Sequence, residues 1–348
     1  MKTNEASSLL ADLPQGSKLL IVRLRSLGDL VLETPAIAAL HSWRPDLQIH
    51  VLVEPRFAAV FDGNPAVSQV IFSRGLLEIA RELRQRRFPI VFNQHGGPRS
   101  AFLTAASGSA LRVCWKGFQF SFLYNVLVPD AKEFYGQAVV HTVEHRISQF
   151  YSTGLPRGPI PKAQVFPQAE VIESVKQIVS REGIEPGARY AVLQPGARST
   201  GMRWPVEKFA EVARWLRRRH GIKSVVNLAP GDAEMAADVR NTMWDCCSVP
   251  DALNIRELIA LVAQASILIG NDSGPVHLAA ATGCPVVAIY GATNPAQWHP
   301  WQTNYRVVHT GAVFDPKRGD KSVAERELRH VSTIAVEEVC AACEELLT

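Results

Sequence analysis

The chain has no run of apolar residues that approaches the ~18 needed for a helix to cross a membrane. Its first residues, MKTNEASSLLADLPQGSK, lack the basic start and apolar core of a secretory signal peptide. Low-complexity tracts are missing, and charged residues make up only 20% of the sequence, which excludes a mainly disordered protein. We therefore predict a cytoplasmic protein whose 348 residues, 47% of them apolar, fill the cores of two domains.

Cysteine is too sparse to predict a disulfide framework or a zinc site. The chain has six cysteines, and only Cys340 and Cys343 form a Cys-x-x-Cys pair. A zinc site would need a second such pair or nearby histidine ligands, and the sequence offers neither. An Asp-x-Asp metal motif is missing as well. We expect reduced cysteines, no metal site and no cofactor.

The formal net charge is +4, and the basic residues gather in two runs, 81–87 and 214–219. Both runs fall at the ends of predicted helices, where cations interact favourably with the negative end of the helix dipole. A second interpretation is a surface patch that meets anionic lipid or lipopolysaccharide. Nucleic acid is not expected as a partner, because neither a recognition-helix pattern nor an aromatic RNA-binding pattern accompanies the charge.

Strand-like apolar runs alternate with helix-like stretches in both halves of the chain, a pattern typical of parallel sheets covered by helices. Between the halves, Gly154–Pro161 holds three prolines and two glycines and is predicted to be a linker. We predict an α/β protein with domains at 1–160 and 161–332 and a last helix within 333–348. The predicted strands are Leu19–Leu24, Ile49–Val53, Gln69–Phe72, Ile90–Phe92, Tyr190–Leu193, Ser224–Leu228, Ile267–Ile269, Val286–Tyr290 and Tyr305–His309.

The most informative segment is Asn271–Pro295, NDSGPVHLAAATGCPVVAIYGATNP. It is typical of a strand end, a tight turn, a helix and a second strand. Free backbone N–H groups at the start of such a helix, at the positive end of its dipole, bind phosphate or diphosphate. Asp272, Ser273, Gly274 and His277 are therefore candidate phosphate-binding residues. For His277 the alternative is a packed or solvent-facing histidine.

A second loop, Gln194–Pro205, also follows a predicted strand and runs into a helix. Its glycines, hydroxyl groups and two arginines suit a diphosphate, although the loop is not a Walker A motif. Gly196, Ala197, Arg198 and Arg203 are the candidate phosphate-binding residues. The alternative is a surface loop whose arginines are solvated.

Three acidic residues follow other strands. Asp29 comes after Gly28 at the end of the first strand, where its carboxylate either acts as a general base or only caps the next helix. Asp232 and Glu234 follow the strand Ser224–Leu228 and are candidates to accept hydrogen bonds from ribose hydroxyls. Helix capping is the alternative for Asp232.

Three regions together resemble the signature regions of glycosyltransferase family 9, the ADP-heptose:lipopolysaccharide heptosyltransferases. They are Arg23–Leu40, Pro195–Trp204 and Asn271–Pro295, and they occur in the family's order. The resemblance implies a GT-B fold, in which two Rossmann-like domains face each other across a cleft and the C-terminal helix packs back on the N-terminal domain. It further implies that the second domain binds ADP-heptose as donor substrate, while the first binds an inner-core lipopolysaccharide sugar as acceptor.

The resemblance also implies roles for residues. Asp29 matches the family's proposed catalytic base, and Asp272, Ser273, Gly274 and His277 match its donor-binding motif. The family usually carries Lys where this chain has Met202, so we expect Arg198 or Arg203 to supply the positive charge.

These features predict an inverting, metal-independent transferase, with a peripheral contact at the cytoplasmic face of the inner membrane as an additional expectation. Acceptor contacts are expected around Asn93–Ser100 and Arg112–Lys116. The alternatives are a GT-B sugar-nucleotide epimerase or hydrolase, and a catalytically silent nucleotide-sugar-binding protein.

Overall fold

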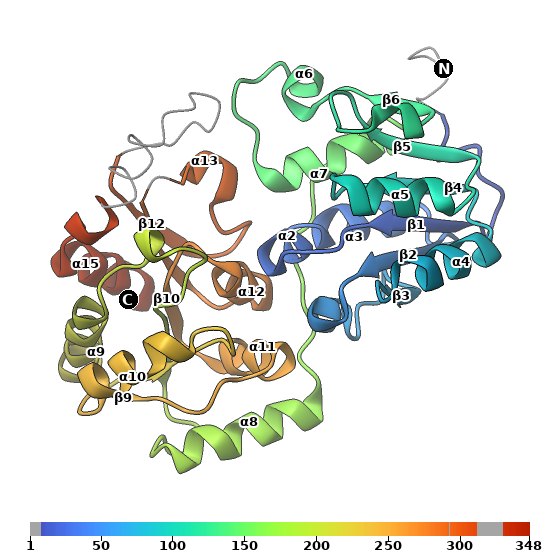
Figure 1. Cartoon of the computed structure of the whole chain (residues 1–348). Coiled ribbons are helices and arrows are strands. Elements are labelled where there is room, and N and C mark those ends of the chain that lie inside the picture. Colours follow the sequence, from blue (N-terminus) through green and yellow to red (C-terminus); the bar gives the residue numbers. More distant parts are fainter. Residues whose placement is uncertain (1–7, 292, 312–329) are drawn as a thin grey trace. The chain divides into compact units, whose positions relative to one another are not determined.

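The computed structural model of the protein describes residues 8–291, 293–311 and 330–348. The chain divides into two compact units, Met1–Gln164 and Val165–Thr348, which we call unit 1 and unit 2. Each unit is built on one six-stranded sheet with helices packed against it (Figure 1). The division lies just after the predicted boundary between residues 160 and 161.

The sheet of unit 1 consists of β1 (Lys18–Val22), β2 (Gln48–Val53), β3 (Gln69–Phe72), β4 (Ile90–Asn93), β5 (Leu111–Trp115) and β6 (Val126–Val128). The strand order is β3-β2-β1-β4-β5-β6, and every neighbouring pair is parallel. Leu19 of β1 pairs with Ile49 on one side and Ile90 on the other. The order therefore reverses between β1 and β4, and open α/β sheets bind ligands at the carboxyl end of this switch point.

The helices of unit 1 are α2 (Leu27–Val31), α3 (Thr34–Trp43), α4 (Leu76–Arg86), α5 (Pro98–Ala106), α6 (Ala131–Tyr135) and α7 (Thr142–Tyr151). Leu83 of α4 and Leu103 of α5 share a core with Val91 of β4. The next residue, Phe92, has its ring 4.8 Å from that of Phe150 on α7. Because neighbouring strand residues point to opposite faces, α4 and α5 cover one face of the sheet and α7 covers the other.

The sheet of unit 2 consists of β7 (Tyr190–Gln194), β8 (Lys223–Val226), β9 (Cys247–Ser248), β10 (Ile267–Asn271), β11 (Val286–Tyr290) and β12 (Tyr305–His309). Its order is β12-β11-β10-β7-β8-β9, again with parallel neighbours. The switch point lies between β7 and β10. The two loops predicted to bind phosphate follow these two strands, so the fold brings them to one edge of the sheet.

The helices of unit 2 are α8 (Ala169–Arg181), α9 (Val206–His220), α10 (Ala233–Met243), α11 (Ile255–Gln264), α12 (Gly274–Thr282), α13 (Pro295–Trp298) and α15 (Val336–Leu347), with a 3-10 turn at Thr200–Met202. The helix α9 buries Phe209, Val212, Ala213 and Leu216 on one face and ends at Gly221 in the left-handed conformation. Among the described residues, no helix is both long enough and apolar enough to cross a membrane.

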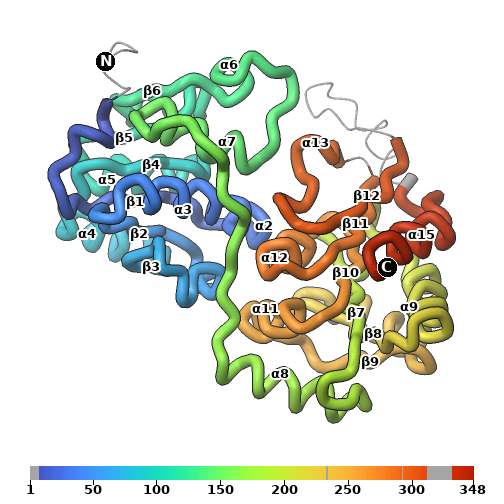
Figure 2. Tube along the Cα trace, turned by 180° about the vertical axis from the view of Figure 1, so that it is seen from behind, coloured from blue at the N-terminus to red at the C-terminus, as the bar shows by residue number. Residues whose placement is uncertain are grey.

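The last helix packs within the core of unit 2, and the expectation that it also packs on the N-terminal domain stays a prediction. Val339, Cys343 and Leu346 of α15 are buried in the same core as Phe209 of α9. The helix contacts α9 and β12, and its place beside them is visible in Figure 2. Just before α15, the Ile334 carbonyl accepts a hydrogen bond from the indole N–H of Trp204 at 3.0 Å. The apolar stripe of α15 is thus needed to complete the core of its own unit.

Candidate functional site

Four elements of unit 1 meet around Asp29 at the carboxyl end of the switch point. Asp29 lies in the first turn of α2, and its side chain is only 17% exposed. Arg23, just beyond β1, forms an ion pair with Asp29 Oδ1, and Arg146 of α7 donates to the same oxygen at 2.8 Å. Ser26 donates to the other carboxylate oxygen at 2.9 Å. The carbonyl of Gln94, which follows β4, accepts from both arginines, at 2.6 and 3.0 Å.

These contacts set the protonation of Asp29. Burial raises the pKa of Asp29, but the charges of Arg23 and Arg146 together lower it by more than burial raises it. The net pKa therefore lies well below the usual range for aspartate. The carboxylate is therefore ionised near neutral pH and held in a fixed position. It is also a weak base in this arrangement, because each ion pair lowers its proton affinity.

A second carboxyl group, Glu33, lies beneath this cluster and was not predicted from the sequence. Its side chain is fully buried, and within the part of the chain described here neither carboxyl oxygen has a hydrogen-bond partner. Its nearest cation is Arg146, whose Nε lies 3.8 Å from Oε2. Burial raises the pKa of Glu33 to about 7, against the opposing effect of Arg146 and Arg23. A buried acid beside two arginines is an unusual feature that requires an explanation.

The arginines of this cluster were also missed, although the sequence contains a signal for each. Arg23 directly follows the apolar strand LLIV, where a charged side chain must find a buried partner. Arg146 falls on the same helical face as the buried Val143, Ile147 and Phe150. A charged residue on an otherwise buried stripe indicates an internal ion pair.

The loop after β4 adds a turn and a histidine to the same region. Asn93 accepts from the backbone N–H groups of His95 and Gly96, at 2.9 and 3.1 Å. Gly96 and Gly97 both have positive φ, which glycine adopts without strain. Burial lowers the pKa of His95 to about 4, and the charges of Arg23 and Arg25 add to this effect. His95 is therefore a neutral hydrogen-bonding group near neutral pH.

In unit 2, the loop after β7 is closely packed around Gly196, where a side chain would require its neighbours to shift. A Cβ on Gly196 would lie 2.6 Å from Asp232 Oδ2 and 2.9 Å from Gln194 Nε2. Arg203 donates from Nε to the carbonyl of Ala197 at 3.2 Å, and its Nη2 is 3.7 Å from Asp232 Oδ1. Gly196, Ala197, Arg203 and Asp232 are therefore neighbours, while their binding of a ligand stays a prediction.

Asp232 stabilises the loop that follows β8 and does not cap a helix. It is the residue before α10, yet its side chain makes no capping hydrogen bond. Instead Oδ2 accepts from the backbone N–H of Ala229 at 3.0 Å. The capping alternative for Asp232 is therefore not what the structure shows.

The loop after β10 is tied to the loop after β7 through Asn271. The buried Asn271 side chain accepts from the Trp204 backbone N–H at 3.0 Å and donates to the Pro195 carbonyl at 2.7 Å. Ser273 is the N-cap of α12, but its hydroxyl donates to the Asn271 carbonyl and makes no capping bond. Asp272 accepts from Thr293 at 2.5 Å, and burial raises its pKa. The first turn of α12, beginning at Gly274, thus stands beside the Gly196 loop.

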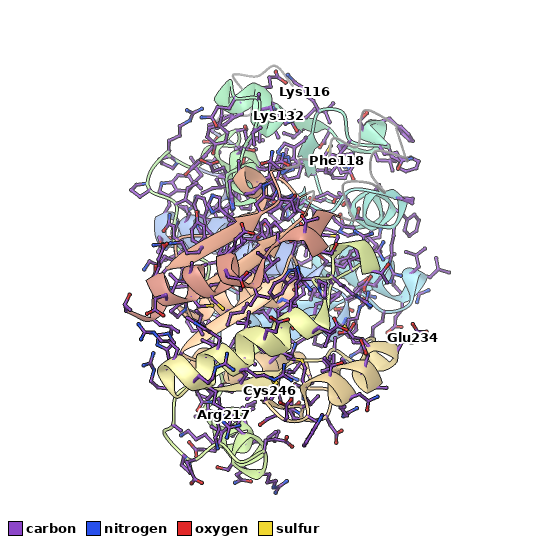
Figure 3. All side chains as sticks on the ribbon, turned by 90° about the vertical axis from the view of Figure 1, so that its left-hand side faces the viewer. Lys116, Phe118, Lys132, Arg217, Glu234 and Cys246 are labelled. Carbon is purple, nitrogen blue, oxygen red and sulfur yellow. The ribbon has the colours of Figure 1, made fainter. Side chains whose placement is uncertain are left out.

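The other candidates of unit 2 differ in how far their side chains are exposed. Arg198 is exposed on its loop, and Glu234 is exposed on the outer side of α10 (Figure 3). His277 is 3% exposed, and its ring lies 6.5 Å from that of Trp298. Met202 is half-buried in the 3-10 turn before Arg203. Within the described ranges, no group of three or more His, Cys, Asp or Glu side chains is placed to hold a metal ion.

Comparison with known proteins supports the predicted relationship. The model of glycosyltransferase family 9 (heptosyltransferase) matches residues 76–326. Lipopolysaccharide heptosyltransferase 3 of Escherichia coli strain K12 is 25% identical over 341 residues, which cover 93% of this chain and 96% of that protein.

Solved structures show the same fold. A family 9 glycosyl transferase from Veillonella parvula superposes with a TM-score of 0.86 at 24% identity, over 96% of this chain and 98% of that one. For E. coli ADP-heptose lps heptosyltransferase II the TM-score is 0.78 at 22% identity, over 95% and 98% of the two chains. The predicted GT-B fold, built from two Rossmann-like domains, is confirmed. The chain belongs to glycosyltransferase family 9, the heptosyltransferases, and is a glycosyltransferase.

Proposed function

We propose that the protein transfers heptose from ADP-heptose to a sugar of the lipopolysaccharide inner core. The observation that carries the proposal is the cluster at the switch point of unit 2, where two tightly packed loops and a helix N-terminus meet in a member of a heptosyltransferase family. Two relatives in E. coli, lipopolysaccharide heptosyltransferase 3 and ADP-heptose lps heptosyltransferase II, suggest the donor and the class of acceptor.

The donor half of the proposal uses unit 2. Backbone N–H groups at the start of α12 and on the Gly196 loop would bind the diphosphate. The first lie at the positive end of a helix dipole, and the second belong to a glycine-rich turn. Arg203 already lies on this loop and would supply the charge that Met202 lacks, with the exposed Arg198 as a second cation. Asp232 is the better ribose candidate, since it contacts the loop while Glu234 points outward. We assign a structural role to His277, whose buried side chain would support α12 by packing.

The acceptor half uses unit 1. Asp29 would take the proton of the acceptor hydroxyl as that oxygen attacks the anomeric carbon and the C–O bond to the diphosphate breaks, inverting the configuration. Arg23 and Arg146 keep the carboxylate ionised and oriented before the acceptor binds. An acceptor hydroxyl that displaces one of these contacts would raise the basicity of Asp29 when it is needed. The arginines and backbone dipoles of the donor loops would stabilise the leaving ADP without a metal ion.

The test is turnover of purified protein with ADP-heptose and a heptose-deficient lipopolysaccharide acceptor, followed by release of ADP and by mass of the product. We expect Asp29→Ala to lose at least ~100-fold in turnover, the usual contribution of a general base, while calorimetry shows unchanged ADP binding. Unchanged turnover would remove Asp29 from the mechanism. If the wild type releases ADP but forms no acceptor product, the protein is a hydrolase. If it binds ADP-heptose but releases no ADP, it is a silent binding protein.

A further inference from the structure

A basic hollow lies at the edge of the unit 1 sheet opposite to Asp29. Its volume is about 800 Å³, and it is lined by Lys18, Arg81, Arg84, Arg86 and Arg87, with no acidic residue in the lining. Lys18 is the first residue of β1, and the arginines belong to the second half of α4 and its C-cap. The hollow is therefore at the amino ends of the strands, away from the edge that carries Asp29.

The positive charge of this hollow is largely uncompensated. Arg86 is paired with Glu82 at 2.7 Å and donates to Gln69 at 2.7 Å, whereas Arg81, Arg84, Arg87 and Lys18 have exposed side chains. Even with the Glu82 partner counted, the hollow carries four positive charges, as many as the formal net charge of the whole chain. Such a concentration creates a local field that attracts anions.

Helix-dipole stabilisation does not account for all of these cations. The effect is confined to the last turn of a helix, which leaves out Arg81, and Lys18 comes from a strand. A purely solvated basic surface also does not explain the apolar residues beside it. Leu77 is 72% exposed and precedes Arg81 and Arg84 by four and seven residues, so the three side chains share one face of α4.

The apolar surface continues onto α5, which packs beside α4. Near the start of both helices, Arg99 donates to the carbonyl of Arg74 at 2.7 Å. Near their ends, Arg84 lies against Gly108, where an added Cβ would be 3.2 Å from its Nη1. Between these contacts Phe102 of α5 is 40% exposed. We define the α4–α5 face as Leu77, Arg81, Arg84, Arg87 and Phe102, together with Lys18.

We propose that the α4–α5 face is a contact surface for a lipid bilayer with anionic headgroups. Its cations would bind headgroup phosphates, and Leu77 and Phe102 would enter the boundary between headgroups and acyl chains. A soluble phosphate would use the hollow alone and gain nothing from the exposed apolar side chains. The inference uses no residue of the proposed catalytic or donor sites and goes beyond the proposed function.

The experiment is flotation of the full-length protein with vesicles of phosphatidylcholine, with and without phosphatidylglycerol. We expect binding only to the anionic vesicles, weakened by high salt, which screens the cations. Arg81→Glu combined with Arg84→Glu should weaken binding at least about tenfold, since each basic residue near an anionic surface contributes about 1 kcal/mol. Leu77→Ser should weaken it severalfold at unchanged charge.

Matched controls come from unit 2. Arg217→Glu combined with Arg218→Glu reverses two exposed charges on α9, where Figure 3 shows Arg217, and Trp244→Ser removes a side chain that is 78% exposed. Both controls should bind anionic vesicles like the wild type. Circular dichroism checks folding, and Arg81→Gln with Arg84→Gln replaces the reversal variant if that one does not fold.

Three outcomes would overturn the proposal. One is equal binding to neutral and anionic vesicles or to neither, and another is an equal loss in the unit 2 charge control. The third is competition by millimolar inorganic phosphate with no effect of Leu77→Ser, which would identify a site for a free anion. Calorimetry with ADP separates this test from the test of the proposed function. All variants should bind ADP like the wild type. If the wild type does not bind ADP, the proposed function fails but the vesicle result still stands.

Discussion

At the scale of single residues, the chemistry of unit 1 depends on an imbalance between two guanidinium groups and two carboxyl groups in one small volume. Asp29 receives hydrogen bonds from both arginines, whereas Glu33 receives none among the described residues. Both guanidinium groups therefore contact Asp29, whereas Glu33 has only Arg146 nearby, at 3.8 Å. Asp29 stays ionised, and Glu33 titrates in the neutral range because burial dominates its pKa.

This difference predicts a pH-dependent stability difference between the wild type and Glu33→Gln. The pKa of Glu33 rises from 4.5 to about 7 on folding, so the folded state retains a proton that the unfolded state loses. Wild-type stability should therefore fall relative to that of the variant as the pH rises from about 4.5 to 7, and the difference should be constant above that window. Its size should be roughly 3 kcal/mol, measured by urea unfolding at pH 5 and pH 8.

The control for this measurement is Glu78→Gln, which removes an exposed carboxylate from the start of α4 in the same unit. It should change unfolding by a similar small amount at both pH values. A Glu33→Gln variant whose stability relative to wild type is the same at pH 5 and pH 8 would show that Glu33 is ionised in the folded protein and paired with Arg146.

At the scale of elements, the two loops at the unit 2 switch point lie close together where glycine residues leave room. A Cβ at Gly270 of β10 would lie 2.7 Å from Gln194 Cβ at the end of β7. A Cβ at Gly196 would meet both Gln194 and Asp232. Glycine at these two positions leaves room for the loops after β7 and β10 to lie close together, where Asn271 joins them.

Gly196→Ala should therefore disrupt the proposed donor site without unfolding the unit. The new methyl group would displace Asp232 and, through it, Arg203, at a cost of ~1–3 kcal/mol. We expect ADP binding in calorimetry to weaken roughly tenfold or more. The matched control is Gly231→Ala, because an added Cβ there meets nothing within 4 Å. Equal affinities of the two variants would place the diphosphate elsewhere.

The sequence predicted these elements well because their signals are local. The apolar strands and the Gly/Asn/Asp turns that follow them are each specified by neighbouring residues. The packing partner of α15 was not predictable in this way, since an amphipathic helix shows which face is buried but not what covers it. The same limit explains Arg146, whose partner Asp29 is 117 residues away in the chain.

At the scale of the whole molecule, each unit has a core cluster and a candidate site built from its own residues. One core cluster of unit 2 is built from its sheet, α9, α10 and α15, all within Val165–Thr348. Every predicted donor residue that the structure brings together, from Gly196 to Gly274, belongs to this unit as well. The charged cluster around Asp29 belongs wholly to unit 1.

This division predicts that residues 165–348, expressed alone, fold and bind ADP without catalysing transfer. The affinity should stay within about tenfold of that of the full chain, because no proposed diphosphate or ribose contact is removed. Turnover should be undetectable, since the proposed base is absent. Calorimetry with ADP and the product assay measure the two effects, and the same fragment carrying Gly196→Ala should lose binding as the full chain does. A folded fragment that no longer binds ADP would mean that unit 1 supplies an essential donor contact, and the assignment of the nucleotide to unit 2 alone would then be wrong.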